Sequence, residues 1–374
     1  MRVLFAATLI LLSIATIVAC SNDDPKPTPA PSVLLSPTLS QTPSPTPTPT
    51  PSPTPFIAPP LTLDAVFSVG GLGTLDLDPD QLRTIIATGD VMPGRYTDVT
   101  IRNRGDDFLY PVEATKDLTA SADITVVNLE APIVDGCPYH DSGLTFCGRP
   151  GFLDAMVAAG IDILTLENNH IGNYGPSGMA ETREHLDAAG LGWADRSTPA
   201  IIDVRGVTFG VIAFNGVGEF IDRAEMSRQI ELLGDEVDVV VAAFHWGAEY
   251  VSVPRSAGVV APDDPIEIAH AAVDAGADLV IGHHPHWVQA VELYDDTLIV
   301  YSHGNFIFDQ MWSYETRVGV VGKYTFYDED LIGVEFIPVL IEDFAQPVVM
   351  TGTEAQAVLN GMRVASDELA ATLP

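Results

Sequence analysis

Three histidines crowd into four positions of the stretch VIGHHPHWVQ, residues 280–289, which begins with the end of an apolar run. The whole chain of 374 residues holds only nine histidines. Neutral imidazole is a good metal ligand, whereas protonated histidines placed together repel one another. Pro285 stiffens the link between His284 and His286, so these two side chains could bind one metal ion or two. The alternative is that His283, His284 and His286 are ordinary polar residues where a strand leaves the core.

Two carboxylates follow other apolar runs, Asp90 in TGDVMPGR and Glu130 in VVNLEAP. A buried acid without a partner is costly, and a cation beside it removes that cost. Asp90 alone would be interpreted as a turn residue that caps the backbone. Arg95 either pairs with one of these two acids or forms a fork that binds a substrate phosphate or carboxylate. The residues themselves leave both alternatives open.

Further polar residues lie in ENNHIGNYG and AFHWGAEY. Asn168 and Asn169 are common turn residues, yet an Asn followed by His170 also supplies an oxygen ligand and a proton donor. A lone histidine such as His245 is more often structural than functional. Together, however, the candidates form an oxygen and imidazole donor set without thiolate, which is typical of Mn, Fe or Zn hydrolytic sites. The set predicts one or two divalent ions bound by Asp90, Glu130, Asn169, His245, His284 and His286.

The elements that must position these residues are apolar runs rich in Val and Ile. Their pattern predicts strands buried on both faces at residues 83–90, 122–130, 161–170, 207–215, 237–247, 277–286 and 297–306. Helical patterns lie between several of them, at residues 151–160, 177–190 and 265–276, and each closes on a glycine. Strand-like runs and a last helical stretch follow from Tyr324 to Pro374. The alternation predicts an α/β domain over residues 62–374.

Nearly every apolar run ends in Asp, Glu, Asn or His. In open α/β sheets, sites form outside the carboxyl ends of the strands. One sheet edge could therefore collect residues that lie more than two hundred positions apart in the sequence. The pattern predicts a single pocket at that edge.

The first nineteen residues carry Arg2 and then an unbroken apolar stretch, which indicates an export signal. Cys20 follows small Ala19 at the position where a lipoprotein is lipidated, and the alternative is an uncleaved membrane anchor. Both interpretations place the rest of the chain outside the cytoplasm. Residues 20–61 are rich in Pro, Thr and Ser and predict an extended, semi-rigid spacer.

Cys137 and Cys147 bracket the short loop CPYHDSGLTFC. In an oxidising exterior this spacing favours a disulfide. Two free thiols are the next alternative, and a cysteine metal site is the last because no CxxC spacing occurs.

The net charge is -34, with only three lysines. Nucleic acid is excluded as an expected partner because phosphate binding needs a basic surface. The acidic residues indicate a solvated surface, and a part of them could attract divalent cations.

Six motifs in fixed order, GDVMPGR, NLEAP, NNHIGNYG, HWGAEY, GHHPH and GNFIFDQ, resemble the CapA family of capsule and poly-gamma-glutamate synthesis proteins. The resemblance covers roughly residues 84–340. This family is similar to the calcineurin-like metallophosphoesterases, so the resemblance implies a layered sandwich of two mixed sheets flanked by helices.

The resemblance also implies a role for each matching residue. Asp90 and His286 would bind a first metal ion, and Glu130 would bridge it to a second. The second ion would be completed by Asn169, His245 and His284. His170 would be the general acid and Asn305 a pocket residue, and His283 receives no role. With the residue-type arguments above, the expected catalytic residues are His170, Asp90 and Arg95, and the expected substrate-binding residues are Arg95, Asn168 and Asn305.

Two positions depart from the pattern. Met92 stands where phosphoesterases usually carry a metal-binding histidine, which implies a weak or missing first metal. His303 stands where the family more often has an apolar residue before GNF.

The expected function is that of a lipid-anchored surface protein with a metal-dependent hydrolase site. It would act in the synthesis, export or anchoring of an anionic capsule polymer such as poly-gamma-glutamate, with the membrane and the polymer or its synthase subunits as partners. The alternative is a non-catalytic factor that binds polymer or organises a synthase. Met92 favours that alternative, and the intact NNH and HPH motifs oppose it.

Overall fold

Runs of β-branched residues form two mixed β-sheets in the computed structural model, which describes residues 61–67 and 77–373. The larger sheet has the order β14-β13-β12-β1-β2-β3-β4, with β11 also paired to β1. Its strands are β1 (Leu82–Val91), β2 (Ile124–Leu129), β3 (Ile163–Thr165), β4 (Gly192–Ala194), β11 (Asn305–Ile307), β12 (Val318–Tyr327), β13 (Asp330–Glu342) and β14 (Gln346–Val349). The smaller sheet has the order β5-β6-β7-β8-β10-β9. Its strands are β5 (Ala200–Val204), β6 (Val207–Asn215), β7 (Val239–His245), β8 (Leu279–His283), β9 (Val291–Tyr294) and β10 (Thr297–Val300).

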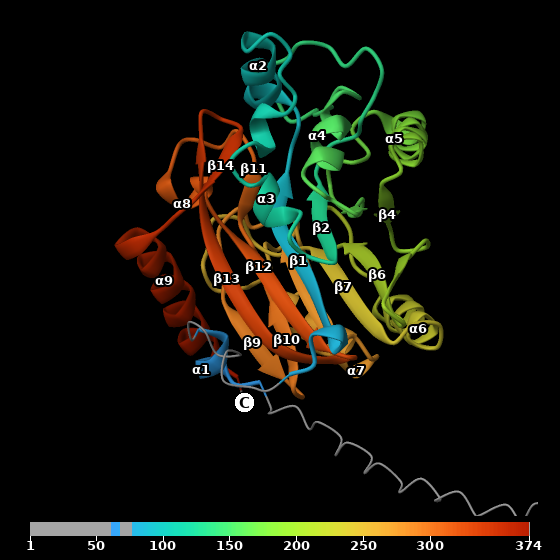
Figure 1. Ribbon diagram of the computed structural model, residues 1–374, viewed down its shortest axis with the longest axis vertical. Coiled ribbons are helices and arrows are strands. Elements are labelled where there is room, and N and C mark those ends of the chain that lie inside the picture. The colour runs from blue at the N-terminus through green and yellow to red at the C-terminus, as the bar shows by residue number, and fades with distance from the viewer. Residues whose placement is uncertain (1–60, 68–76, 374) are drawn as a thin grey trace, which may run out of the picture. The chain divides into compact units, whose positions relative to one another are not determined.

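The central strands of both sheets are parallel. β1, β2, β3 and β4 are parallel neighbours in the larger sheet, and β6, β7, β8 and β10 in the smaller one. Every residue of β2 and of β7 is buried, as the continuous apolar runs predicted. In Figure 1, β1 runs from the lower end of the view up to the start of α2 (Arg95–Asn103), so the carboxyl ends of its parallel neighbours lie at that upper edge.

Alternate side chains of each strand enter different cores because successive residues point to opposite faces of a sheet. Val126 of β2 and Val211 of β6 meet in the core between the sheets. Val127 packs outward against the helices of the larger sheet, and Val240 of β7 packs outward against those of the smaller sheet. This is the layered sandwich of two mixed sheets flanked by helices that the motif resemblance implied.

Helices cover both outer faces. The larger sheet is covered by α2, α3 (Lys116–Thr119), α4 (Phe152–Ala158) and α5 (Gly175–Ala189). The smaller sheet is covered by α6 (Arg223–Gly234) and α7 (Pro265–Asp274), while α9 (Gly352–Ala370) contacts both β9 and β13. The remaining short elements are α1 (Leu63–Val66), η1 (Pro79–Gln81), η2 (Tyr110–Val112) and α8 (Tyr314–Arg317).

The expected helices at 151–160, 177–190 and 265–276 correspond to α4, α5 and α7. The predicted stop of α5 is confirmed, because Gly190 caps the helix in the left-handed conformation with φ 73°. α2 and α6 were missed by the sequence analysis. In α2 the stretch RYTDVTIRN contains several β-branched residues, whose low helix propensity hides the helix.

Two expected strands are shorter or differently arranged. The run 161–170 gives only the short strand β3, and its polar end is a loop. The run 297–306 is not one strand but two, because the chain leaves β10 in the smaller sheet and enters β11 in the larger one. Gly304 permits the crossing: its φ is 73°, and a Cβ there would lie 2.8 Å from the carbonyl oxygen of Val318.

The predicted signal peptide (1–19), Cys20 and all but the last residue of the predicted spacer lie outside the described residues. Those described belong to one compact unit, Phe56–Pro374. Within the described ranges, none of the helices has the length and apolar character needed to cross a bilayer.

Candidate metal centre

Polar side chains lie in register at the carboxyl ends of the parallel strands. Asp90 near the end of β1 pairs with Asn128 of β2, and Glu130 follows one residue beyond that strand. In the other sheet, His245 at the end of β7 pairs with His283 at the end of β8. Each of these side chains is at most 2% exposed. The prediction of one sheet edge is therefore wrong: the residues come from the carboxyl ends of strands in both sheets.

Distances between the two sheets show that the predicted ligands converge. The His286 Nδ1 atom lies 3.2 Å from Asp90 Oδ2, and its Nε2 atom lies 4.0 Å from Glu130 Oε1. The His245 Nε2 atom lies 3.8 Å from Glu130 Oε1 and 2.9 Å from Asn169 Oδ1. The rings of His245 and His284 lie 4.8 Å apart. Residues from five separate segments of the chain, including that of Glu130, thus come together at this site.

The donor set fits a divalent cation. Both carboxylate oxygens of Glu130 and both ring nitrogens of His284 are inaccessible to solvent and have no hydrogen-bond partner. A buried polar group left unsatisfied costs about 1–3 kcal/mol, and more when it is charged. Imidazole nitrogens and carboxylate oxygens are ligands for Mn, Fe and Zn, so a bound ion would satisfy these atoms together.

The donor atoms fall into two groups, each with its atoms within 4.8 Å of one another. Asp90, Glu130 and His245 form one, and Glu249, His284 and His286 form the other. Glu249 was missed by the sequence analysis, although it lies in the quoted motif HWGAEY. Its side chain is 41% exposed and its Oε1 atom lies 3.9 Å from His284 Nε2. The Tyr250 amide, which donates to the Pro285 carbonyl at 2.9 Å, fixes this turn against the histidine loop.

Four residues at or near the site other than glycine have a positive φ. Arg95, Tyr250, His284 and His286 have φ values of 47°, 60°, 92° and 57°. A residue other than glycine costs about 1–3 kcal/mol in such a sparsely populated region, and such residues cluster at functional sites. The strain at His284 and His286 supports the ligand interpretation over an ordinary polar loop end.

Asn128 and Asn168 form a chain of hydrogen bonds that ends at Asp90. Asn128 Nδ2 donates to Asp90 Oδ1 at 2.9 Å, and Asn168 Nδ2 donates to Asn128 Oδ1 at 3.1 Å. Asn168 Oδ1 accepts from the backbone amides of His170 and Ile171. Asn128 was missed by the sequence analysis although NLE contains it. Both ends of the Asn168 amide bind protein atoms, which supports positioning of the NNH loop; its substrate-binding role stays a prediction.

Asn305 orients His286 through a close side-chain contact. Its Oδ1 atom lies 2.9 Å from His286 Nδ1, and its amide nitrogen donates to the Thr316 carbonyl at 2.8 Å. His283, which received no expected role, places Nδ1 3.5 Å from Asp90 Oδ1. His303 lies behind it, with Nε2 2.7 Å from Tyr324 Oη. Asn305 and His283 thus lie beside His286 and Asp90 in the buried part of the site.

Arg95 does not pair with Asp90 or Glu130, so that alternative is wrong. Its guanidinium instead binds both carboxylate oxygens of Asp309, one through Nε at 3.0 Å, and the Tyr96 amide donates to the same acid. The sequence could not show this pairing because the partners are 214 positions apart. The anion-binding role of Arg95 stays a prediction, with Asp309 already balancing its charge.

Met92 offers no ligand, as its residue type implied. Its side chain is fully buried beside Phe146 and Phe308, and its sulfur accepts a hydrogen bond from the Gly94 amide. A first ion would therefore lack the extra histidine.

Burial and close charges separate the pKa values of the site residues. Burial raises the pKa of Asp90, but the close imidazoles of His283 and His286 outweigh it and hold that pKa well below its usual value. Burial, with help from the charge of Asp90, raises the pKa of Glu130 well above its usual value. Burial opposes the charge on His286, yet the two acids raise its pKa to about 9. Without a metal ion, a proton on His286 therefore offsets part of the acid charge.

The neighbouring histidines are neutral at physiological pH. Burial lowers the pKa of His245 well below its usual value, that of His284 to about 3 and that of His170 to about 4. The His170 Nε2 atom lies 4.0 Å from Glu130 Oε1, and its Nδ1 atom lies 3.2 Å from Asn173 Oδ1. The His170 ring thus directs Nε2 toward the metal centre.

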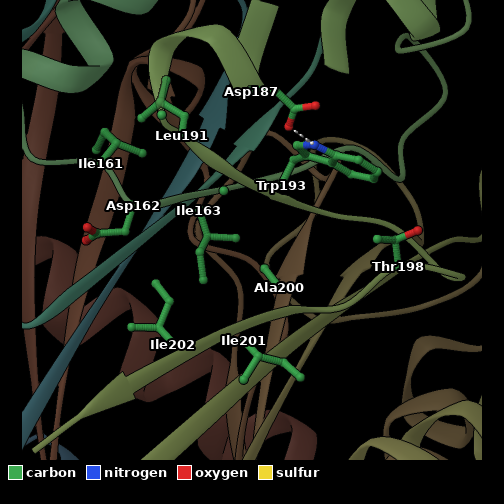
Figure 2. Close-up of a pocket in the computed structure, with 12 residues that line it drawn as sticks. Ile161, Asp162, Ile163, Asp187, Leu191, Trp193, Thr198, Ala200, Ile201 and Ile202 are labelled. Carbon is green, nitrogen blue, oxygen red and sulfur yellow. Dashed lines mark hydrogen bonds between the residues drawn. The ribbon is translucent and has the colours of Figure 1, made fainter. Parts of the chain in front are cut away.

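A separate hollow of about 500 Å³ lies at the neighbouring edges of β4 and β5 (Figure 2). Ile161, Ile163 and Ile202 line it, and Trp193 Nε1 donates to Asp187 Oδ1 at 3.0 Å across one side. The predicted site residues are not among those that line this hollow. It is distinct from the centre at the carboxyl ends of the strands.

Comparison with known proteins gives a family match. A model described as "Bacterial capsule synthesis protein PGA_cap" matches residues 84–310. The PGA biosynthesis protein CapA of Bacillus subtilis is 28% identical over 297 residues, which cover 72% of this chain and 76% of that protein. The capsule biosynthesis protein CapA of Bacillus anthracis is 27% identical over 303 residues, covering 74% and 71%. A solved putative 5'-nucleotidase from Staphylococcus aureus superposes with a TM-score of 0.44 at 14% identity, covering 76% of this chain and 58% of that one; we draw no conclusion from that likeness.

Proposed function

Because the chain belongs to the family of bacterial capsule synthesis proteins, we propose that it acts in the synthesis, export or anchoring of an anionic capsule polymer, with poly-gamma-glutamate as the first candidate. We further propose that its metal centre is a hydrolase site acting on a phosphoester or a gamma-glutamyl amide. The observation that carries the second proposal is the buried set of unpartnered donor atoms on Glu130 and His284. Such atoms are costly in a purely structural loop and useful around a cation.

The residues divide the work by position. Asp90, Glu130, His245, His284 and His286 would hold one or two ions of Mn, Fe or Zn, with Asn169 adding an amide oxygen. When bound, such an ion acts as a Lewis acid toward a phosphoryl or carbonyl oxygen and stabilises developing negative charge. Asn305 and Asn168 hold His286 and the NNH loop in place through the hydrogen bonds described above.

His170 would transfer the proton at Nε2. Its low pKa makes the free ring neutral at physiological pH, so it must take up a proton before it can protonate a leaving group. A bound anionic substrate favours that uptake because a negative charge nearby raises the pKa of an imidazole. Asn173 Oδ1, close to Nδ1, can accept a hydrogen bond from the Nδ1–H group of the charged ring.

A non-catalytic assembly role is the second candidate. It is favoured by Met92, which removes a ligand that metallophosphoesterases usually have, and by Asp309, which neutralises Arg95. In that role the centre would bind polymer carboxylates or a synthase subunit without turnover.

The experiment that separates the two uses the purified full-length chain in detergent, prepared without chelators. Metal content by mass spectrometry is measured for the wild type, for a His284→Ala, His286→Ala double variant and for His170→Ala. Hydrolase function predicts near-stoichiometric metal in the wild type and in His170→Ala, loss of metal in the double variant, and turnover of phosphoesters or gamma-glutamyl amides only in the wild type. Absence of metal after reconstitution, or capsule formation in cells restored fully by His170→Ala, would move the assignment to the assembly role.

We also propose that Cys20 carries a lipid and that the domain lies outside the cytoplasm. The apolar leader and the Pro-rich residues 20–61 support this. Incorporation of labelled fatty acid that disappears in a Cys20→Ser variant is the expected result. Equal labelling of both proteins would contradict the assignment.

A further inference from the structure

The loop 137–147 is closed at its base by the Cys137–Cys147 disulfide, the pairing that the sequence favoured. Its base is buried, with Cys147 fully inaccessible, whereas Leu144 near its tip is 73% exposed. A cross-link at the base restricts the residues next to it most strongly. Phe146, which directly precedes Cys147, is therefore held in place while the tip stays open to solvent.

Phe146 lies between two candidate functional residues. Its ring is 2% exposed, and its centroid lies 4.0 Å from that of His170. The guanidinium carbon of Arg95 lies 4.6 Å from the same Phe146 ring. The aromatic ring thus covers one face of the His170 imidazole and separates it from the arginine.

A shared hydrogen-bond acceptor ties the loop backbone to the same histidine. The Phe146 amide donates to Asn173 Oδ1 at 2.6 Å, and this oxygen also lies 3.2 Å from His170 Nδ1. Arg95 Nη1 donates to the Gly143 carbonyl, and Tyr174 Oη lies 3.3 Å from Cys147 Sγ. The His170 ring is consequently fixed on one face by Phe146 and at Nδ1 by Asn173, which leaves Nε2 directed toward Glu130.

We propose that Phe146, held by the Cys137–Cys147 disulfide, is a positioning residue for His170, an inference that rests on the proposed proton-transfer role of that histidine. Opening the disulfide changes the orientation of the His170 ring. Metal binding stays intact because the candidate metal ligands all lie outside the loop. A dithiol reductant would supply two electrons and two protons, break the S–S bond to give two thiols, and itself be oxidised to a disulfide.

The test compares full-length wild type with Phe146→Leu, Phe146→Tyr and a Cys137→Ser, Cys147→Ser double variant. The first readout is the rate at which diethyl pyrocarbonate modifies His170, followed by peptide mass spectrometry. His270, on the outer face of the smaller sheet, is the internal reference. Phe146→Leu and the double variant should raise the His170 rate relative to His270, and Phe146→Tyr should keep the wild-type ratio because it retains the ring.

The second readout is turnover. We expect kcat to fall by up to about a hundred-fold in Phe146→Leu and the double variant, the loss that a displacement of about 1 Å can cause, with KM and metal content near wild type. The Phe146→Tyr variant should keep the wild-type kcat. Circular dichroism checks that each variant is folded, and loss of metal from Phe146→Leu would count against the proposal because it indicates a general structural role.

The two readouts separate the possible failures. Unchanged His170 reactivity in Phe146→Leu and in the double variant overturns the positioning role even if His170→Ala abolishes turnover. If the wild type shows no turnover, the hydrolase function fails, and the modification ratios still decide whether Phe146 fixes the ring.

Discussion

Glu130, at the carboxyl ends of the parallel strands, differs from the carboxylates at their amino ends. At the amino ends, an aspartate precedes each of β2, β3, β7 and β8. Its carboxylate accepts a hydrogen bond from a backbone amide of the neighbouring strand. The pairs are Asp123 with Thr84 at 2.8 Å, Asp162 with Thr125 at 2.8 Å, Asp238 with Thr208 at 2.7 Å and Asp278 with Val240 at 2.7 Å. At the carboxyl ends, both carboxylate oxygens of Glu130 and both ring nitrogens of His284 have no hydrogen-bond partner.

This difference shows how residue types shared by both ends serve different purposes. A carboxylate that accepts backbone amides stabilises the pairing of two strands. A buried carboxylate and imidazole left unpaired destabilise the protein, and such a cost is retained where function requires it. Stability and metal binding should therefore respond to substitutions at opposite ends of the sandwich.

The largest expected effect is on metal binding at the carboxyl ends. Glu130→Gln removes a carboxylate of the first donor group that also lies 4.0 Å from His286 of the second, so we expect bound metal to fall from near-stoichiometric to near zero. The metal-free variant should be at least as stable as the metal-free wild type because an unpaired buried acid is gone. Metal content and thermal unfolding of both proteins measure these effects, and full retention of metal would remove Glu130 from the ligand set.

Glu249→Gln sharpens the division between the two donor groups. Glu249 is partly exposed and faces His284, so its loss should affect one ion and spare the other. We expect the affinity for one ion to fall by about 10- to 100-fold, the range seen when a single partner of a metal site is lost. Titration with Mn and Zn by calorimetry measures it, with Glu219→Gln, a partly exposed acid beside Arg196, as the control. Equal binding by both variants would exclude Glu249.

An amino-end substitution should have the opposite effect. Asp123→Ala removes an acceptor for the Thr84 amide and hydroxyl and a partner of Arg205, so the free energy of unfolding should fall by about 1.5–3 kcal/mol while metal content stays unchanged. Urea unfolding measures the loss, and Glu236→Ala, at an exposed position in the turn before β7, is the matched control. Metal loss in Asp123→Ala without destabilisation would break the comparison.

The smallest effect is the pH dependence of two amino-end acids. Burial raises the pKa of Asp123, but Arg205 and Thr84 outweigh burial and bring it below the usual value of 3.8, whereas burial raises the pKa of Asp162. The contribution of Asp123 to stability is thus present above its unfolded pKa and is lost as pH falls through its folded pKa. That of Asp162 is present below its unfolded pKa and is lost as pH rises through its folded pKa.

The measurement is the difference in unfolding free energy between wild type and each aspartate-to-asparagine variant from about pH 3 to about pH 6, across the range where carboxylates titrate. As pH falls, the stabilisation by Asp123 should shrink and that by Asp162 should grow. If the two free-energy differences instead changed in the same direction with pH, the environments of Asp123 and Asp162 would not differ as described.

The sequence by itself determined the α/β class, the buried parallel strands and most residues of the candidate metal centre. Strand burial follows from local composition, and helix ends such as Gly190 follow from local backbone freedom, so neighbouring residues suffice to encode them. The rule that sites lie outside the carboxyl ends of strands then indicated Asp90, Glu130 and His245 as site residues, although they come from two sheets. Their proposed ligand roles came from residue type and motif resemblance.

Only the tertiary structure decided which side chains meet. It divided residues 297–306 between two sheets, paired Arg95 with Asp309, and brought Glu249 to His284 and Phe146 to His170. These contacts join residues that are distant in the sequence, and local pattern carries no information about strand register or loop direction. The physical reason is that a side chain meets its partner through the packing of both sheets together, which no single segment specifies.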